Sequence, residues 1–282
     1  MEKKEFKELA SNYADADEFV RVLEEAPNSF RVNTLRLSTE EFLQGFHVEC
    51  GQVEWLDYAF TCKEKIGNTL EHACGYAFSQ SLSSMLPSLC LNPLPGEEVL
   101  DSCAAPGAKT THLSQLMGNE GAIMAVDARP KRLRSLVSNC RRWGAANVAC
   151  VVRDSTQLGG RERFDKVLVD APCSCLGTRD GWKGYEMQRH DRLQLLLALA
   201  GYRLLRKGGQ MVYSTCTITE KENEGVISSL LEETDAKLVE ARLPLKTSRG
   251  LAEYGKEFRK TRRVYPREIN SEAFFVAKVE KP

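Results

Sequence analysis

Residues 99–111 read VLDSCAAPGAKTT, an apolar strand followed by a loop of small residues and the start of a helix. In a doubly wound sheet, a nucleotide-like ligand binds at the carboxyl end of the first strand. Small side chains in such a loop let the backbone approach the ligand closely. The stretch therefore predicts an α/β fold with a ligand site at this strand end, although a simple tight turn would have the same composition.

Apolar strands and helices alternate along the chain on both sides of this loop. Alternation at this spacing indicates parallel βαβ units and a doubly wound sheet. We expect a Rossmann-like domain over 73–282 with seven strands, the last two forming a hairpin-like pair, and a leading helix over 75–91. The predicted strands are 98–102, 122–126, 148–152, 166–169, 210–214, 237–241 and 273–279, and the predicted helices are 109–117, 130–142, 188–205 and 220–233.

Residues 1–72 have a different pattern, which predicts a small α/β appendage. Apolar residues recur on or near one face of a single amphipathic helix over 4–26, and Pro27 with Asn28 ends it. A strand over 30–35, a helix that starts at 38–41 and a second strand over 46–53 follow. The residues on the helix face are Phe6, Leu9, Phe19, Val22 and Leu23.

Composition excludes several classes of protein. The 39 basic and 39 acidic residues give zero net charge, which argues against a purely electrostatic nucleic-acid binder but allows local basic patches. The first ten residues lack the apolar core of a signal peptide, and no apolar run is long enough for a membrane span. We therefore expect a cytoplasmic protein that does not contact membranes. The ten cysteines include no CxxC pair, so we expect reduced thiols and no metal site.

The acids after the next two strands suggest which ligand the loop binds. Asp127 ends the second strand, where an acid accepts hydrogen bonds from ribose hydroxyls. The loop matches neither GxGxxG nor a P-loop, so NAD is disfavoured and a P-loop nucleotide is excluded. A ligand with a ribose and no phosphate, S-adenosylmethionine, fits better. Asp154 is a candidate to bind the adenine amino group and equally a candidate helix cap.

Two cysteines follow the fourth and fifth strands. Cys173 lies in DAPCSC (170–175), and Cys216 lies in STCT (214–217). In this sheet type strands one, four and five are neighbours, so their carboxyl ends open on one crevice. We expect the two thiols to face each other beside the cofactor. A pair of inert buried thiols is the alternative, which holds for most single cysteines.

Cytosine methylation gives such a pair of thiols a purpose. Carbon 5 of cytosine is a poor nucleophile, and a thiolate that adds to carbon 6 makes it reactive. A base must then remove the proton from carbon 5. A thiolate nucleophile needs a lowered pKa, and we expect the helix start near 219–220 and Lys109 to lower the pKa of Cys216. Asp170 is expected to hold the edge of the base and to assist protonation at nitrogen 3.

Several runs of sequence closely resemble the Sun (Fmu) family of RNA cytosine-5 methyltransferases. The resemblance covers about residue 30 to the end. It departs from the family pattern at Ala108 and Cys175, where glycine is usual. The matching segments are RVNTL (31–35), FSQSLSSMLP (78–87), DSCAAPGAKT (101–110), Asp127, DAPCSCLG (170–177) and YSTCTITEKENE (213–224).

The resemblance implies a role for each matching residue. Cys216 would be the nucleophile, Cys173 would help to release the product, and residues 1–72 would form an RNA-recognition-like domain. Because short chains of this kind resemble archaeal tRNA cytosine-5 methyltransferases, tRNA is the favoured substrate, rRNA is the alternative, and we expect a monomer. The residues implied in binding S-adenosylmethionine are Cys103, Ala104, Ala105, Pro106, Gly107, Ala108, Lys109, Asp127, Arg132, Asp154 and Asp170.

Two groups of basic residues are candidates for contacts with RNA phosphates. The group within 131–142 is better explained as a solvated helix face. The denser group within 256–267 is interleaved with Phe258 and Tyr265 and favours RNA. The members are Lys131, Arg132, Arg134, Arg141 and Arg142 in the first group, and Lys256, Arg259, Lys260, Arg262, Arg263 and Arg267 in the second.

Three other functions remain open on the sequence. A DNA cytosine-5 methyltransferase would use Cys173 as the nucleophile, but those enzymes usually carry a long target-recognition region that we do not find. A non-catalytic RNA-binding factor on the same scaffold would not need both cysteines and Asp170. A small-molecule methyltransferase has no obvious use for a pair of thiols.

Overall fold

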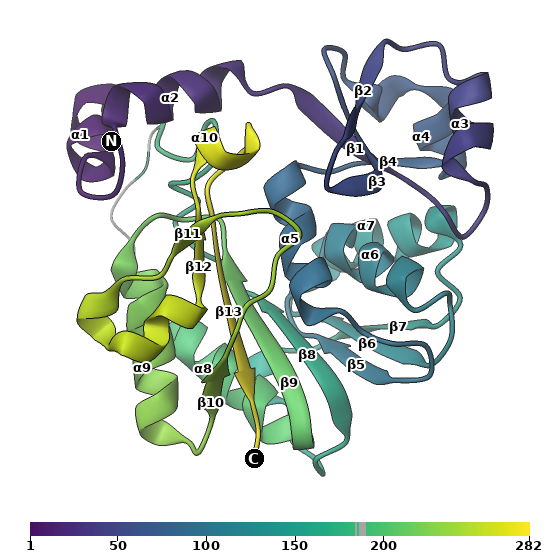
Figure 1. The fold of residues 1–282 in the computed structure, drawn as a ribbon. Coiled ribbons are helices and arrows are strands. Elements are labelled where there is room, and N and C mark those ends of the chain that lie inside the picture. The colour runs from purple at the N-terminus through teal and green to yellow at the C-terminus, as the bar shows by residue number, and fades with distance from the viewer. Residues whose placement is uncertain (184, 186–189) are drawn as a thin grey trace.

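A computed structural model describes residues 1–183, 185 and 190–282, and it contains a large and a small sheet (Figure 1). The large sheet has the strand order β11-β12-β13-β9-β8-β5-β6-β7, and β10 also pairs with β13. Its five parallel strands have β5 at the centre, so the predicted doubly wound fold is confirmed. Their bounds are β5 Glu98–Asp101, β6 Ala122–Asp127, β7 Val148–Val152, β8 Phe164–Asp170 and β9 Leu205–Thr215.

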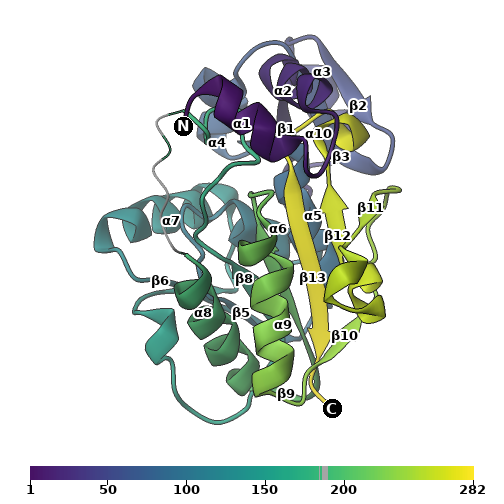
Figure 2. The ribbon, with the colours of Figure 1, turned by 90° about the vertical axis from the view of Figure 1, so that its left-hand side faces the viewer.

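Helices cover both faces of the large sheet. One layer is made by α5 (Leu82–Leu91), α6 (Ala108–Leu116) and α7 (Pro130–Trp143), which pack in sequence against one another. The other is made by α8 (Asp191–Leu204) and α9 (Glu224–Glu233), which lie side by side in Figure 2. The start of the predicted helix 188–205 lies outside the described residues. In the predicted helix 220–233, a 3-10 turn over Glu220–Glu222 precedes α9.

The antiparallel part of the sheet is larger than the sequence predicts. Strand β13 (Phe274–Glu280) pairs with β9 along one edge. Along its other edge, one short strand pairs with the first part of β13 and a second short strand pairs with the last part. They are β12 (Arg262–Val264) and β10 (Lys237–Val239), and β11 (Ser248–Arg249) extends β12. The sheet therefore has nine strands where seven are predicted. Strands this short give too weak an alternation to be recognised in sequence.

The small sheet has the order β2-β3-β1-β4 and is antiparallel. Its strands are β1 (Asn28–Val32), β2 (Cys50–Val53), β3 (Leu56–Cys62) and β4 (Ala77–Ser79), with helices α3 (Thr39–Gly45) and α4 (Leu70–Cys74). Aromatic rings of Phe30, Phe42, Phe46 and Phe60 form its core. Since β4 pairs with β1, the sheet extends beyond residue 72, the predicted end of the appendage.

Two predicted helices are wrong in their extent. The helix predicted over 4–26 is two helices, α1 (Lys3–Ala10) and α2 (Ala16–Glu25), because the Asp15 side chain accepts a hydrogen bond from the Glu18 amide and starts a new helix. The helix predicted over 75–91 begins only at Leu82, since Gly75 has a φ of 77° and ends α4 in a left-handed turn.

The N-terminal helices α1 and α2 pack beside the segments that follow β8 and β9 and carry Cys173 and Cys216, rather than on the small sheet. Phe6 of α1 stacks on Trp182 with ring centroids 5.5 Å apart, and the same cluster contains Leu176 and Ile218. These last two residues lie within three positions of Cys173 and Cys216. The N-terminal helices therefore support the segments that carry the two thiols. Among the described residues, no helix has the length and apolar character needed to cross a membrane.

Candidate active site

The structure brings the two predicted cysteines together. Strands β8 and β9 are parallel neighbours in which Asp170 pairs with Ser214, so the segments after them leave the sheet side by side. The sulfur atoms of Cys173 and Cys216 lie 3.4 Å apart. The expected proximity of these thiols is confirmed, and both are partly exposed to solvent.

Hydrogen bonds between the two segments fix this arrangement. The Ser174 hydroxyl lies 2.6 Å from the Thr217 hydroxyl, and the Ser174 amide donates to the Glu222 carboxylate at 3.0 Å. Gln194 of α8 donates to the same carboxylate and to the Pro172 carbonyl oxygen, both at 2.9 Å. Hydrogen bonds between buried polar groups favour a single geometry. Ser174, Thr217 and Glu222 lie within the quoted motifs, but the sequence analysis assigned them no role, and Gln194 lies outside every motif.

A third thiol, that of Cys175, completes a cluster at the site. The sulfur atoms of Cys173, Cys175 and Cys216 all lie within 4.8 Å of one another. The Cys175 backbone has a φ of 58°, in the left-handed region where glycine is favoured. Cys175 follows Cys173 by two positions, but only the fold brings Cys216 to them.

The thiols strongly affect one another's ionisation. Hydrogen bonds from Cys173, and then from Cys216, lower the pKa of Cys175 to about 3. The same contacts, together with burial, raise the pKa of Cys216. The expected lowering of the Cys216 pKa is therefore wrong for the protein without its ligands, because the neighbouring thiols outweigh the short 3-10 turn at Glu220. A substrate that separates the three sulfurs would remove this effect.

Asp170 and Lys109 form an ion pair beside the thiols. The Lys109 ammonium lies 2.7 Å from one Asp170 oxygen and donates to the Ser84 hydroxyl at 2.9 Å. The Ser214 hydroxyl donates to the other Asp170 oxygen at 2.8 Å. Lys109 is thus bonded to Asp170 rather than to Cys216, and this ion pair orients the Asp170 carboxylate. Ser84 and Ser214 are members of this network that the sequence analysis did not single out.

The small-residue loop lies between β5 and α6. The Ala104 amide donates to the Val126 carbonyl oxygen, which joins the loop to the neighbouring strand β6. Gly107 precedes α6 with a φ of 105°, and a Cβ there would lie 2.9 Å from Leu136 Cδ1. Only glycine combines this backbone conformation with so close a neighbour. Residues 103–108 therefore form the predicted tight strand-to-helix connection.

Asp127 ends β6, as predicted, and faces this loop. Its two oxygens accept hydrogen bonds from the amides of Ala105 at 3.3 Å and Arg129 at 2.9 Å. Arg132 lies 3.4 Å from Asp127 and donates to the Ala105 carbonyl oxygen. Asp154 is exposed and accepts from the Thr156 amide at 3.0 Å, so it caps a 3-10 turn in this structure.

The residues around the loop fit S-adenosylmethionine. Two buried oxygens at the carboxyl end of β5, Asp101 Oδ1 and Ser102 Oγ, have no hydrogen-bond partner. Burial raises the pKa of Asp101 to about 7. Orphaned polar atoms and the carboxylates of Asp127 and Asp170 suit a ligand with an amine, two ribose hydroxyls and a sulfonium charge. Burial also raises the pKa of Cys103, whose thiol stays neutral in this loop.

A polar cavity lies between the appendage and the segment that follows Cys173 and Cys175. It has a volume of about 330 Å³. Its lining includes Ser29 of β1, Gln80 just after β4, Arg179 in the segment after Cys175, and Glu272 just before β13. Burial raises the pKa of the Glu272 carboxyl, which lines this cavity. A cavity at the junction of two parts of a chain is a common ligand site.

The structure corrects the prediction for the basic residues near the tail. Arg263 is 2% exposed and forms an ion pair with the fully buried Glu224, while Arg262 pairs with Glu240. Lys260 donates to the Leu238 carbonyl oxygen. Phe258 and Tyr265 are both buried and cannot stack on exposed bases. Much of this group stabilises β12 and its neighbours instead of contacting RNA.

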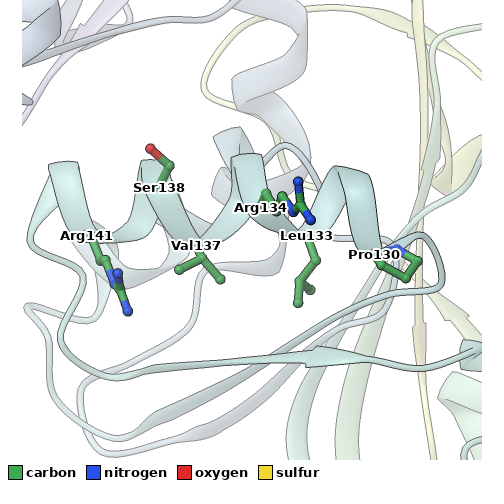
Figure 3. Close-up of a pocket in the computed structure, with 6 residues that line it drawn as sticks. All are labelled: Pro130, Leu133, Arg134, Val137, Ser138 and Arg141. Atoms are coloured by element: carbon green, nitrogen blue, oxygen red, sulfur yellow. The ribbon is translucent and has the colours of Figure 1, made fainter.

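The basic residues of α7 are divided between two environments. Arg132 and Arg142 donate to backbone carbonyl oxygens of Ala105 and His72. Arg134 and Arg141 remain exposed and line an open hollow of about 370 Å³ along α7 (Figure 3). The hollow contains none of the cysteines or loop residues and is not the candidate active site. Its remaining lining residues are Pro130, Leu133, Val137 and Ser138.

Two family models match the chain. The model described as 16S rRNA methyltransferase RsmB/F matches residues 88–280, and the model described as the N-terminal domain of 16S rRNA methyltransferase RsmF matches residues 3–82. Together they cover the appendage and the large sheet. The first model contains all the cysteines of the cluster and the loop over 103–108.

Curated relatives and a solved structure show the same relationship. A tRNA (cytosine(49)-C(5))-methyltransferase of Pyrococcus abyssi is 39% identical, over 99% of this chain and 97% of the relative. Ribosomal RNA small subunit methyltransferase F of Erwinia tasmaniensis is 36% identical over 95% of this chain, which spans only 60% of that relative. The crystal structure of a methyltransferase homologue from Pyrococcus horikoshii superposes with a TM-score of 0.82, at 33% identity, over 98% of each chain.

The resemblance based on short motifs therefore extends over the whole chain. The motifs with two cysteines, the loop and the strand order all lie within the matched residues. The chain belongs to the RsmB/F family of S-adenosylmethionine-dependent methyltransferases.

Proposed function

We propose that this protein methylates carbon 5 of cytosine in RNA, with tRNA as the substrate, through a covalent bond between cysteine and cytosine. The 3.4 Å approach of the Cys173 and Cys216 sulfurs beside Asp170 is the observation that carries the proposal. The near full-length similarity to a tRNA cytosine-C5 methyltransferase favours tRNA, and similarity to an rRNA enzyme leaves rRNA as the alternative. We further propose a cytoplasmic monomer.

Cys216 is assigned the nucleophilic step. Its thiolate adds to carbon 6 of the base, and the electrons of the carbon 5–carbon 6 double bond make carbon 5 nucleophilic. S-adenosylmethionine, held by residues 103–109 with Asp127 and Arg132, supplies an electrophilic methyl group when it is bound. We place Asp154 at the adenine end of this site. Its cap on the 3-10 turn would have to open to accept a hydrogen bond from the ligand.

Asp170 and Cys173 are assigned the remaining steps. Asp170, oriented by Lys109 and Ser214, bonds the edge of the base and assists protonation at nitrogen 3. Cys173 takes the proton from carbon 5, the electron pair re-forms the double bond, and the Cys216 sulfur leaves carbon 6. Proton removal needs Cys173 as a thiolate, which a base inserted between the three sulfurs would allow.

The appendage and the cavity are proposed to present the RNA. The small-sheet appendage, extended from the expected 1–72 to β4, would contact the RNA, and the methyltransferase domain would follow it. The 330 Å³ cavity between the two is large enough to admit a base. A target base within a duplex must be unstacked to enter such a pocket, which costs a few kcal/mol.

Two cysteine variants test the assignment. With RNA and S-adenosylmethionine, Cys173→Ala is expected to accumulate a covalent protein–RNA adduct on denaturing gels, because release is blocked. Cys216→Ala is expected to form none. The reverse pattern would assign the nucleophile to Cys173, as in DNA cytosine-5 methyltransferases. If wild-type protein transfers no radiolabelled methyl group from S-adenosylmethionine to any RNA, a binding factor would be favoured. Bisulfite sequencing of RNA from cells without this protein then identifies the cytosine.

A further inference from the structure

The cluster of Cys173, Cys175 and Cys216 has the composition of a metal site. Thiolates are ligands for Zn²⁺ and for other thiophilic ions, and three protein ligands plus water are typical of an open zinc site. In the described part of the chain, this is the one group of three or more such ligands whose atoms come this close together. The proposed methyl transfer uses two of these thiols and has no role for the third.

The separations match a single ion. Zinc–sulfur bonds of about 2.3 Å place the sulfurs of a tetrahedral site about 3.8 Å apart. The Cys173 and Cys216 sulfurs are 3.4 Å apart, and all three sulfurs lie within 4.8 Å of one another. Side-chain rotations that move the sulfurs by up to about 1 Å would give equal separations. The three residues are partly exposed, so an ion can reach them from solvent.

The backbone conformation at Cys175 is unfavourable for a residue with a side chain, yet a cysteine occupies the position. A φ of 58° costs a residue with a Cβ about 1–2 kcal/mol, a cost that glycine does not incur. The loop after β8 nevertheless places a sulfur there, against the Cys173 carbonyl oxygen at 3.4 Å. Because Cys173 and Cys216 are held by separate strand ends, Cys175 completes a three-sulfur face without any change in the sheet.

We propose that Cys173, Cys175 and Cys216 bind one thiophilic divalent cation, such as Zn²⁺, through three thiolates, with water in the fourth position. Cys173 and Cys216, which carry protons in the metal-free protein, release them to solvent when they bind the ion as thiolates, so binding is tighter at higher pH. An ion bound there holds both reacting sulfurs. On the proposed function, the metal-loaded protein therefore cannot form the bond to cytosine.

Cd²⁺ is the spectroscopic probe for this site. The full chain, with a non-thiol reductant and without RNA or S-adenosylmethionine, is titrated with Cd²⁺ while the ultraviolet thiolate-to-cadmium charge-transfer band is recorded. Zn²⁺ then competes for the same site. The expected result for wild-type protein is one tight ion per chain with the band intensity of three thiolates. A charge-transfer band with the intensity of two thiolates or fewer in the wild-type protein would refute the three-thiolate site, with no variant needed.

Two variants locate the site. Cys175→Gly removes one ligand and suits the left-handed backbone, so we expect it to fold. It should bind at least ~100-fold more weakly, because loss of even an outer partner of a metal ligand costs about 10–100-fold. Cys150→Ser is the matched control, since Cys150 lies beside Cys140 and is not a member of the three-sulfur cluster. Equal affinity of Cys175→Gly and wild type, or equal weakening by Cys150→Ser, would overturn the proposal.

The effect of metal on methyl transfer is measured separately. In wild-type protein, one equivalent of Zn²⁺ should abolish transfer, and a chelator should restore it. If protein shown to contain bound Zn²⁺ transfers methyl groups at an unchanged rate, the proposed inhibition is wrong, although the metal site itself would stand. Absence of transfer by metal-free protein would instead count against the proposed function, because the Cd²⁺ titration does not depend on catalysis.

Discussion

Replacement of Glu224 by Gln tests the buried ion pair behind the cysteine segment. Glu224 is the first residue of α9 and is fully buried, and Arg263 of β12 is 2% exposed. The guanidinium donates to both Glu224 oxygens and, at 2.8 Å, to the Ile218 carbonyl oxygen. It also lies 4.8 Å from the centre of the Tyr13 ring. The pair therefore joins the outer strands to the segment that follows Cys216.

The expected loss follows from the burial of both charges. Glu224→Gln keeps the shape of the side chain but leaves the Arg263 charge without a counter-ion, which costs about 3–5 kcal/mol. A domain has about 5–15 kcal/mol of total stability, so the variant loses a large fraction of it. Replacing both partners, as Glu224→Leu with Arg263→Met, is expected to recover most of this loss, because no buried charge then remains.

Urea unfolding at neutral pH measures the loss of stability. We expect a lower urea concentration at the midpoint of unfolding and an unchanged dependence of the unfolding free energy on urea concentration. Glu24→Gln is the matched control, because Glu24 forms an exposed ion pair with Lys3, 2.7 Å away. Pairs of this kind contribute about 0–1 kcal/mol. A loss below about 1 kcal/mol in Glu224→Gln, or a similar loss in both variants, would refute the reasoning from burial.

Three further predictions concern the site. Gly107→Ala should destabilise by about 1–3 kcal/mol, from its φ of 105° and its contact with Leu136, and should weaken S-adenosylmethionine binding in calorimetry. Asp170→Asn loses the ion pair with Lys109, and we expect radiolabelled methyl transfer about 100-fold slower with the fold intact. The raised pKa of Asp101, about 7 against 3.8 unfolded, means that folding favours its protonated form. Wild-type stability should therefore fall from about pH 4 to pH 7, and a urea series should show a smaller fall for Asp101→Asn.

Local sequence patterns determined the parallel half of the fold. The strands at 98–101, 122–127 and 148–152 and helices α6 and α7 lie within one or two residues of the predicted ranges, because hydrophobic period and small-residue turns are local properties. The strand order then follows from the doubly wound sheet type, in which the first, fourth and fifth strands are neighbours. That order alone predicted that Cys173 and Cys216 would meet.

Only the tertiary structure decided which side chains join them. The alternation of strands says nothing about Cys175 turning toward Cys216, since that depends on one left-handed residue. Arg262 and Arg263 form part of a basic run in sequence, yet the pairing of β12 with β13 buries Arg263 against Glu224. The sequence shows the charges and the hydrophobic period along the chain. The burial of a side chain and its bonding partners arise from contacts between segments that are distant in sequence. Those contacts set the ionisation of the thiols.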